Sequence, residues 1–173
     1  MKTITRIKIY LFMLLGILCS NPSYSTTVVG WVESVVVYPK AIDFEAKLDT
    51  GAKISSLNSE TIEIKTKGGK KSVVFDVRTD KGVLHTIELP LVRYSRVKRH
   101  FADSHKRPVV LMHICLGKTM KKVEVNLVDR SRFKYQLLLG KNFLSSGFLV
   151  DSSRINLVNN SCMHSLNKDE REN

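Results

Sequence analysis

A two-residue alternation of apolar and polar side chains runs through most of the chain after residue 25. The alternating runs are short, rich in β-branched and aromatic residues, and separated by turns that contain glycine or proline. No long stretch has the 3.6-residue period of an amphipathic helix. Short alternating strands between regularly spaced turns are typical of barrels and sandwiches. The sequence therefore predicts an all-β domain, either a closed barrel or a sandwich.

The turns place the expected elements along the chain. Lys67-Gly68-Gly69-Lys70 is typical of a tight hairpin turn, and Pro39 separates the first two strands. We expect strands over residues 28–38, 42–48, 57–64, 72–78 and 83–89, and one short helix over residues 141–146.

The second expected strand leads directly into Asp49-Thr50-Gly51. An aspartate at the end of a strand is held by the backbone of the sheet. A threonine hydroxyl can hydrogen-bond locally, and glycine lets another backbone or a substrate come close. Asp-Thr-Gly also forms ordinary turns, so this stretch alone leaves a structural and a chemical interpretation open.

The order of the motifs resembles that of a retropepsin, the retroviral type of aspartic protease, over roughly residues 28–151. Asp49-Thr50-Gly51-Ala52 matches the active-site signature, and residues 137–144 match the late apolar-apolar-Gly strand and helix. Between them, residues 109–117 and 123–128 match the expected hairpin. The resemblance implies a retropepsin-like closed barrel with one Asp-Thr-Gly lobe and one short helix.

The details are similar to one bacterial branch, a retropepsin-like aspartic peptidase domain family formerly labelled an ATP-dependent zinc protease family. Its motifs correspond to residues 49–56, 126–131, 138–141 and 148–151 of this chain. Lys141 stands where the family usually has arginine, Asn58 where histidine is common, and Ser152 where proline is usual. These departures bear on the substrate rather than on the class of protein.

The resemblance implies that Asp49, Thr50 and Gly51 are the catalytic residues of a peptidase. Aspartic proteolysis needs two carboxylates that share a proton around one water molecule. One chain carries one such motif, so we expect a homodimer, with Thr50 bonding across the two-fold axis and the Gly51 N–H donating to a carboxylate. Alternatively, Asp129, Asp151 or Glu124 completes the pair within one chain, although Asp129 is better explained by a structural turn or an ion pair with its neighbour.

Substrate binding is assigned to Ala52 and Lys53 beside the catalytic motif, and to Arg96 and Arg99 in the basic segment 93–107. Lys53 is either a surface cation or a clamp for a substrate carboxylate. The basic segment is either a solvated strand edge or a rim that binds acidic peptides. The formal net charge of +12 favours anionic partners. A peptidase with a peptide or protein substrate is the first hypothesis, and an inactive module that binds an acidic peptide or envelope polymer is the second.

Residues 1–25 resemble a secretory signal peptide, with Lys2, Arg6 and Lys8 before a short apolar run. An uncleaved anchor and a lipoprotein modified at Cys19 are the alternatives. We expect a periplasmic or secreted protein without stable membrane insertion after signal removal. The domain would span residues 26–160, and residues 161–173 would form a charged, disordered tail.

The cysteines and histidines give no clear sign of a disulfide or a metal site. Export permits a disulfide between Cys115 and Cys162, but a cysteine in an apolar strand favours two separate thiols. The histidines are scattered, without metal-ligand spacing or a His-Glu-x-x-His helix, so we expect no metal and no cofactor. An exported protein without a recognised nucleic-acid module is not expected to bind nucleic acid.

Overall fold

The computed structural model describes residues 26–96, 106–145 and 147–162. Within these ranges the chain forms strands and one short helix, as the alternation predicts. The elements are β1 (Thr27–Tyr38), β2 (Ile42–Leu48), β3 (Ser55–Asn58), β4 (Ile62–Lys67), β5 (Lys70–Arg78), β6 (Leu84–Pro90), β7 (Arg93–Arg96), β8 (Lys106–Leu116), β9 (Thr119–Val128), β10 (Leu137–Leu139), α2 (Lys141–Leu144) and β11 (Phe148–Ile155). The expected leader, Arg99 and residues 163–173 of the expected tail lie outside the described residues.

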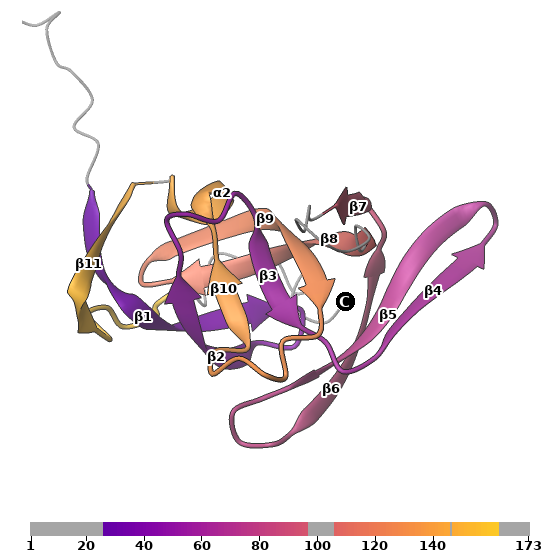
Figure 1. Cartoon of the computed structure of the whole chain (residues 1–173), viewed down its shortest axis with the longest axis horizontal. Coiled ribbons are helices and arrows are strands. Elements are labelled where there is room, and N and C mark those ends of the chain that lie inside the picture. The colour runs from indigo at the N-terminus through magenta and orange to yellow at the C-terminus, as the bar shows by residue number, and fades with distance from the viewer. Residues whose placement is uncertain (1–25, 97–105, 146, 163–173) are drawn as a thin grey trace, which may run out of the picture.

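Six strands close into a barrel in the order β1-β2-β10-β3-β9-β8, with β1 returning to β8 (Figure 1). Closure is possible because β1 is long: residues 32–37 pair with β2, and residues 36–38 pair with β8. The alternation within β2 places every second side chain inside the barrel. The retropepsin-like closed barrel is therefore confirmed. The fully buried core includes Phe44, Leu57, Ile114, Leu127 and Leu137.

A separate three-stranded sheet, β4-β5-β6, covers part of this barrel. Its apolar face, formed by Val73, Phe75, Val77 and Ile87, joins the same buried core. The β4–β5 hairpin projects away from the barrel (Figure 1), and every residue of β4 is exposed. The predicted turn at Gly68-Gly69 is present, with both glycines at positive φ.

The strand expected over residues 57–64 is wrong as a single element. The chain leaves the barrel after β3 and enters the other sheet at β4. Ser59 forms the junction: its hydroxyl donates to the Thr61 carbonyl at 2.6 Å and to the Asp76 carbonyl at 3.2 Å. β3 is buried throughout and β4 is exposed throughout, so the apolar and polar pattern of residues 57–64 does not follow buried and exposed faces and does not reveal the change of sheet.

Cys115 and Cys162 form a disulfide, with their Cα atoms 5.9 Å apart, so the expectation of two separate thiols is wrong. The segment after β11 returns to the β8–β9 turn, where Gly117 N donates to Asn160 Oδ1 and Ser161 N donates to Gly117 O. This return brings together cysteines that are 47 residues apart in sequence. The described fold thus reaches Cys162, past the expected boundary at residue 160.

A buried carboxylate also holds the end of the described chain. Glu33 is fully buried and accepts hydrogen bonds from the backbone N–H groups of Gly30, Leu157 and Val158. Three donors compensate for the removal of the carboxylate from water. Glu33 therefore ties β1 to the segment that follows β11.

Candidate functional site

Asp49 lies directly after β2, at the point where β2 and β10 end side by side in parallel. Its backbone N–H donates to the Leu139 carbonyl at 2.8 Å. Its side-chain Oδ1 accepts hydrogen bonds from Gly51 N at 2.9 Å and Ala52 N at 3.1 Å. The carboxylate is half-buried and is oriented by the loop that carries it. The expected donation from Gly51 to a carboxylate is thus present within one chain.

The Asp49 loop, residues 49–54, is fastened to the start of α2. Lys141 N donates to the Ala52 carbonyl at 2.8 Å, and Asn142 N donates to the Lys53 carbonyl at 3.2 Å. A Cβ atom on Gly140 would lie 2.8 Å from the Ile54 carbonyl carbon, so this contact between two backbones requires glycine. The apolar-apolar-Gly motif therefore sets the position of the loop.

A buried polar network holds the residue that directly follows this loop. Ser55 Oγ donates to Asn142 Oδ1 at 2.9 Å and accepts from Gly140 N at 3.1 Å. Asn142 Nδ2 donates to the Glu124 carbonyl at 2.7 Å, and Asn126 Nδ2 donates to the Ser55 carbonyl at 2.9 Å. Sequence reasoning gave no role to these two asparagines. The signal for Asn126 was an amide side chain within an apolar strand, and that for Asn142 was an amide two residues after a glycine.

The three acids considered as second members of a catalytic pair have other partners. Glu124 accepts two hydrogen bonds from Arg93, at 2.9 and 2.5 Å. Asp129 accepts from the backbone N–H of Ser131, and Asp151 accepts from Ser153 and Arg154. None of these carboxylates is hydrogen-bonded to Asp49 in the described chain.

The predicted substrate-binding residues separate into two groups. Ala52 is half-buried and Lys53 is exposed in the Asp49 loop. The Arg93 hydrogen bond is the main cause of the lowered pKa of Glu124, and the charge of Lys53 contributes, so Lys53 lies near this ion pair. Arg96 is exposed on the edge strand β7, where it pairs with Lys106 of β8, and its described contacts do not join it to the Asp49 loop.

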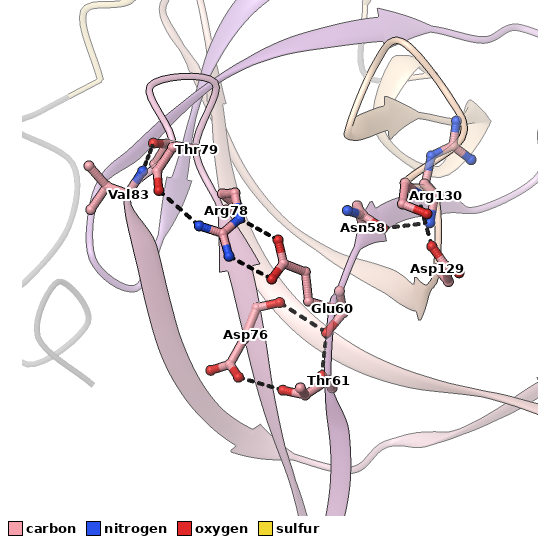
Figure 2. Close-up of polar contacts among 12 residues, drawn as sticks. Asn58, Glu60, Thr61, Asp76, Arg78, Thr79, Val83, Asp129 and Arg130 are labelled. Carbon is pink, nitrogen blue, oxygen red and sulfur yellow. Dashed lines mark hydrogen bonds and ion pairs between the residues drawn. The ribbon is translucent and has the colours of Figure 1, made fainter.

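Arg130 is a residue of the site region that sequence reasoning treated only as structural. Its guanidinium is half-buried, and this burial lowers its pKa. The charge of Arg107 lowers the pKa further, whereas the charge of Asp49 raises it, so Arg130 lies within electrostatic reach of both. Figure 2 shows the Arg130 side chain pointing away from Asp129. The expected turn at Asp129 is present, but these two side chains do not form an ion pair.

A cavity of about 280 Å³ lies at the opposite end of β2 from Asp49, between Ile42–Glu45 and the β5–β6 turn. Its position shows that it is not part of the Asp49 site. In the described part of the chain, no group of three or more His, Cys, Asp and Glu side chains is arranged to hold a metal ion. Over the same residues, no helix is long and apolar enough to cross a membrane.

Comparison with known proteins agrees with the geometry. The family described as "Retropepsin-like aspartic endopeptidase RimB" matches residues 28–160. A crystal structure of the protein Lpg0085 of unknown function, from Legionella pneumophila subsp. pneumophila str. Philadelphia 1, is 35% identical in sequence with a TM-score of 0.66. The match covers 77% of this chain and 98% of that chain.

Curated relatives are named differently. A "Probable alpha-L-glutamate ligase" of Shewanella pealeana is 30% identical over 63% of this chain. A protein of the same name from Desulfotalea psychrophila is 26% identical over 62% of this chain. This chain spans 24% of the length of each of these relatives, so their name describes much longer proteins. The family match covers most of the chain, and the protein belongs to the RimB-like family of retropepsin-like domains.

Proposed function

We propose that this protein is an exported aspartic peptidase that cuts acidic peptides at a site formed by two copies of the chain. The observation that carries the proposal is the Asp49 carboxylate, which is held at the end of β2 by the N–H groups of its own loop. Such a carboxylate is oriented before substrate arrives, and this preorganisation is what general acid–base catalysis requires.

In the proposed mechanism, the two Asp49 carboxylates share one proton because like charges at short range do not both ionise readily. The ionised carboxylate takes a proton from a water molecule, and the water oxygen attacks the peptide carbonyl carbon. The protonated carboxylic acid donates its proton to the carbonyl oxygen. Collapse of the tetrahedral intermediate breaks the C–N bond: the leaving nitrogen receives a proton from the pair, and the ionised carboxylate takes a proton from one hydroxyl of the intermediate, so that the product acid forms and the pair again holds one proton.

A homodimer is supported by the outer edge of the main sheet. Among the described residues, strand β11 ends the sheet order, and exposed apolar side chains lie on β11 and on the paired part of β1. Leu149 is 60% exposed, Ile155 51% and Val28 45%. A self-complementary two-fold contact through this edge would cover these side chains, and the proposal assigns the second Asp49 to the partner in such a dimer.

A preference for acidic substrates is supported by charge and by the relatives. The β4–β5 hairpin carries Lys65, Lys67, Lys70 and Lys71 around its tip, all of them exposed. The curated relatives are named as ligases of glutamate, and a domain like this one accounts for about a quarter of their length. A peptidase domain in the same chain as a glutamate ligase suggests a substrate that contains glutamate.

Export is supported by the leader-like residues 1–25 and by the Cys115–Cys162 disulfide, since disulfides persist mainly in oxidising compartments. The second hypothesis, a binding module without activity, is favoured by the single site carboxylate in each chain. It would hold an acidic peptide or envelope polymer on the basic surface. Its signature is binding that weakens with added salt and no cleavage at any pH.

Turnover of glutamate-rich peptides is expected to rise from pH 7 towards about pH 4, because a shared proton must be present on the carboxylate pair. The fold should tolerate this range. Hydrogen bonds from Ser153 and Arg154 lower the pKa of Asp151 to about 2, from an ordinary 3.8. A lowered folded-state pKa adds stability that is fully present above pH 3.8 and is lost as the pH falls through about 2.

Hydrogen bonds likewise lower the pKa values of Glu60, Asp76 and Asp129. Mass spectrometry of peptide fragments between pH 3 and 7, with circular dichroism at each pH, checks the prediction. Intact peptides at every pH at which the protein remains folded would remove the peptidase hypothesis.

The dimer is tested by placing a charge on the β11 edge. Replacement of Leu149 by arginine should move the protein towards monomers in sedimentation velocity and lower activity at least about tenfold at submicromolar concentration, since 1.4 kcal/mol of lost association energy gives a factor of ten. Val83→Arg is the matched control, because Val83 is 53% exposed on another surface. Equal activity of both variants, together with a monomeric active wild type, would exclude a shared site at this edge.

A further inference from the structure

The backbone N–H and the Nε group of Arg130 have hydrogen-bond partners, whereas, in the described structure, the two terminal amino groups of its guanidinium are available. Its backbone N–H donates to the buried Asn58 side chain at 2.5 Å (Figure 2). Its Nε donates to the Tyr135 carbonyl at 3.4 Å, and its guanidinium lies 4.7 Å from the centre of the Phe133 ring. Within the described part of the chain, neither terminal amino group of Arg130 has a hydrogen-bond acceptor, and no carboxylate forms an ion pair with it.

The loop that carries Arg130 contacts the sheet that carries Asp49. The Tyr135 ring packs edge-on against Trp31, with ring centres 5.8 Å apart. Trp31 directly precedes Val32, which pairs with Lys47 near the end of β2. Asp49 follows two residues after Lys47. The Trp31–Tyr135 pair therefore joins the loop of Arg130 to β1, the strand that pairs with β2 near Asp49.

The local charge is also unusual. Arg130 is half-buried, lies within electrostatic reach of Arg107, and has Asp49 as the acid whose charge acts on it. Burial of a cation costs free energy unless an anion approaches it. Its terminal N–H groups form a planar fork that matches a carboxylate. Such a group is suited to bind an anion that arrives with a ligand.

We propose that Arg130 is the specificity-determining residue of the Asp49 site, and that it binds the side-chain carboxylate of a glutamate or aspartate next to the bond to be cut. This assignment rests on the proposed peptidase function. It makes the arginine a substrate reader, with the Tyr135 carbonyl and the Phe133 ring as the contacts that position its side chain. The lysines of the β4–β5 hairpin would then add long-range attraction without selecting the position of cleavage.

A purely structural role is the rival explanation, since Arg130 also braces the loop of residues 129–136. The two roles differ in what they do to selectivity. A brace would change the cutting of every substrate by the same factor, whereas a reader would change the ratio between a glutamate peptide and its glutamine counterpart. The uncharged glutamine side chain has nearly the same shape, so this ratio isolates the contact with the carboxylate.

The experiment measures kcat/KM for matched peptides in which one glutamate or glutamine is moved through the positions around the cleavage site. Wild-type protein should favour glutamate at least about tenfold at one position, because a site built for a polar partner rejects an analogue that leaves it unpaired. Arg130→Met should bring this ratio close to one, because it should lower the cutting of the glutamate peptide much more than that of the glutamine peptide. Arg130→Lys should keep part of the preference, since the charge remains but the fork is lost.

Arg132→Met is the matched control, because Arg132 is an exposed cation in the same loop. It should leave the ratio unchanged. Equal losses on both peptides in Arg130→Met, or an unchanged ratio in both Arg130 variants, would overturn the proposal. If Arg130→Met does not fold, the glutamate-to-glutamine ratio of Arg130→Lys decides the question alone.

The failure of the inference and that of the peptidase function give different results. A wild type that cuts both peptides equally at every position contradicts the role of Arg130 but keeps the peptidase. A wild type that cuts neither contradicts the peptidase, and fluorescence anisotropy of the same labelled peptides then tests Arg130. Tighter binding of the glutamate peptide that is lost in Arg130→Met supports the carboxylate contact, and equal binding rejects it.

Discussion

Replacement of Asp49 by asparagine is expected to lower peptide turnover by about a thousandfold, within the range contributed by general acid–base groups. Asparagine keeps a carbonyl oxygen in the place of Oδ1, which accepts from Gly51 N and Ala52 N. The loop should therefore keep its conformation. The amide cannot ionise or carry the shared proton, so neither the activation of water nor the protonation of the carbonyl oxygen can proceed normally. Steady-state kcat/KM and thermal unfolding together measure the two effects.

Asp129→Asn is the control for the Asp49 variant. Asp129 is an exposed acid whose Oδ1 accepts from Ser131 N, so its replacement should leave turnover within about twofold of wild type while slightly weakening the turn. An Asp49→Asn protein that retains more than a tenth of wild-type activity would place the chemistry elsewhere. Loss of activity in both variants would point to a general effect of charge.

The second large effect is expected for Gly140→Ala, which should destabilise the fold by about 3 kcal/mol, at the upper end of the usual cost of overpacking. Gly140 has φ −94° and ψ −176°, an extended conformation that alanine adopts freely. The cost is therefore purely steric. The added Cβ would lie 2.8 and 2.9 Å from the carbonyl carbon and oxygen of Ile54 and 3.0 Å from the Ala52 oxygen, which are backbone atoms.

Relief of this contact requires the Asp49 loop to move away from α2. We therefore expect Gly140→Ala to lose activity even at temperatures where it remains folded. Urea unfolding gives the stability difference, and Gly68→Ala serves as the control. Gly68 has a φ of 56° and no neighbour within 4 Å of an added Cβ, so its change should cost only about 1 kcal/mol through the backbone. A Gly140 variant as stable as the Gly68 variant would contradict the close contact.

Local features of this protein can be predicted from its sequence because they depend on residues close together in the chain. The alternation from Ile42 to Leu48 places the inward and outward faces of β2 correctly. The turn at Gly68-Gly69, the β8–β9 hairpin and the short helix after Gly140 follow from equally local patterns. The Asp49 loop belongs to this group, since its hydrogen bonds join residues two and three apart.

Other features depend on how distant segments return to one another. Nothing near Cys115 indicates that the chain after β11 comes back to pair it with Cys162. The alternation through Ser59 does not reveal that β3 and β4 belong to different sheets. Contacts between segments that are distant in sequence depend on the whole barrel, because each such contact needs the intervening strands to be in place first.

The site itself divides in the same way. The motif around Asp49 was identified from the order of its residues. Gly140 was identified from the apolar-apolar-Gly motif that contains β10. The residues that support the site were not identified from the sequence. Asn142 lies 87 positions after Ser55, with which it forms a hydrogen bond, and Arg130, in the loop between β9 and β10, lies within electrostatic reach of Asp49. Periodicity and short motifs record which face of a strand is buried. Which polar groups meet across the barrel follows from strand order and register, which join segments too far apart in the chain for any local pattern to encode.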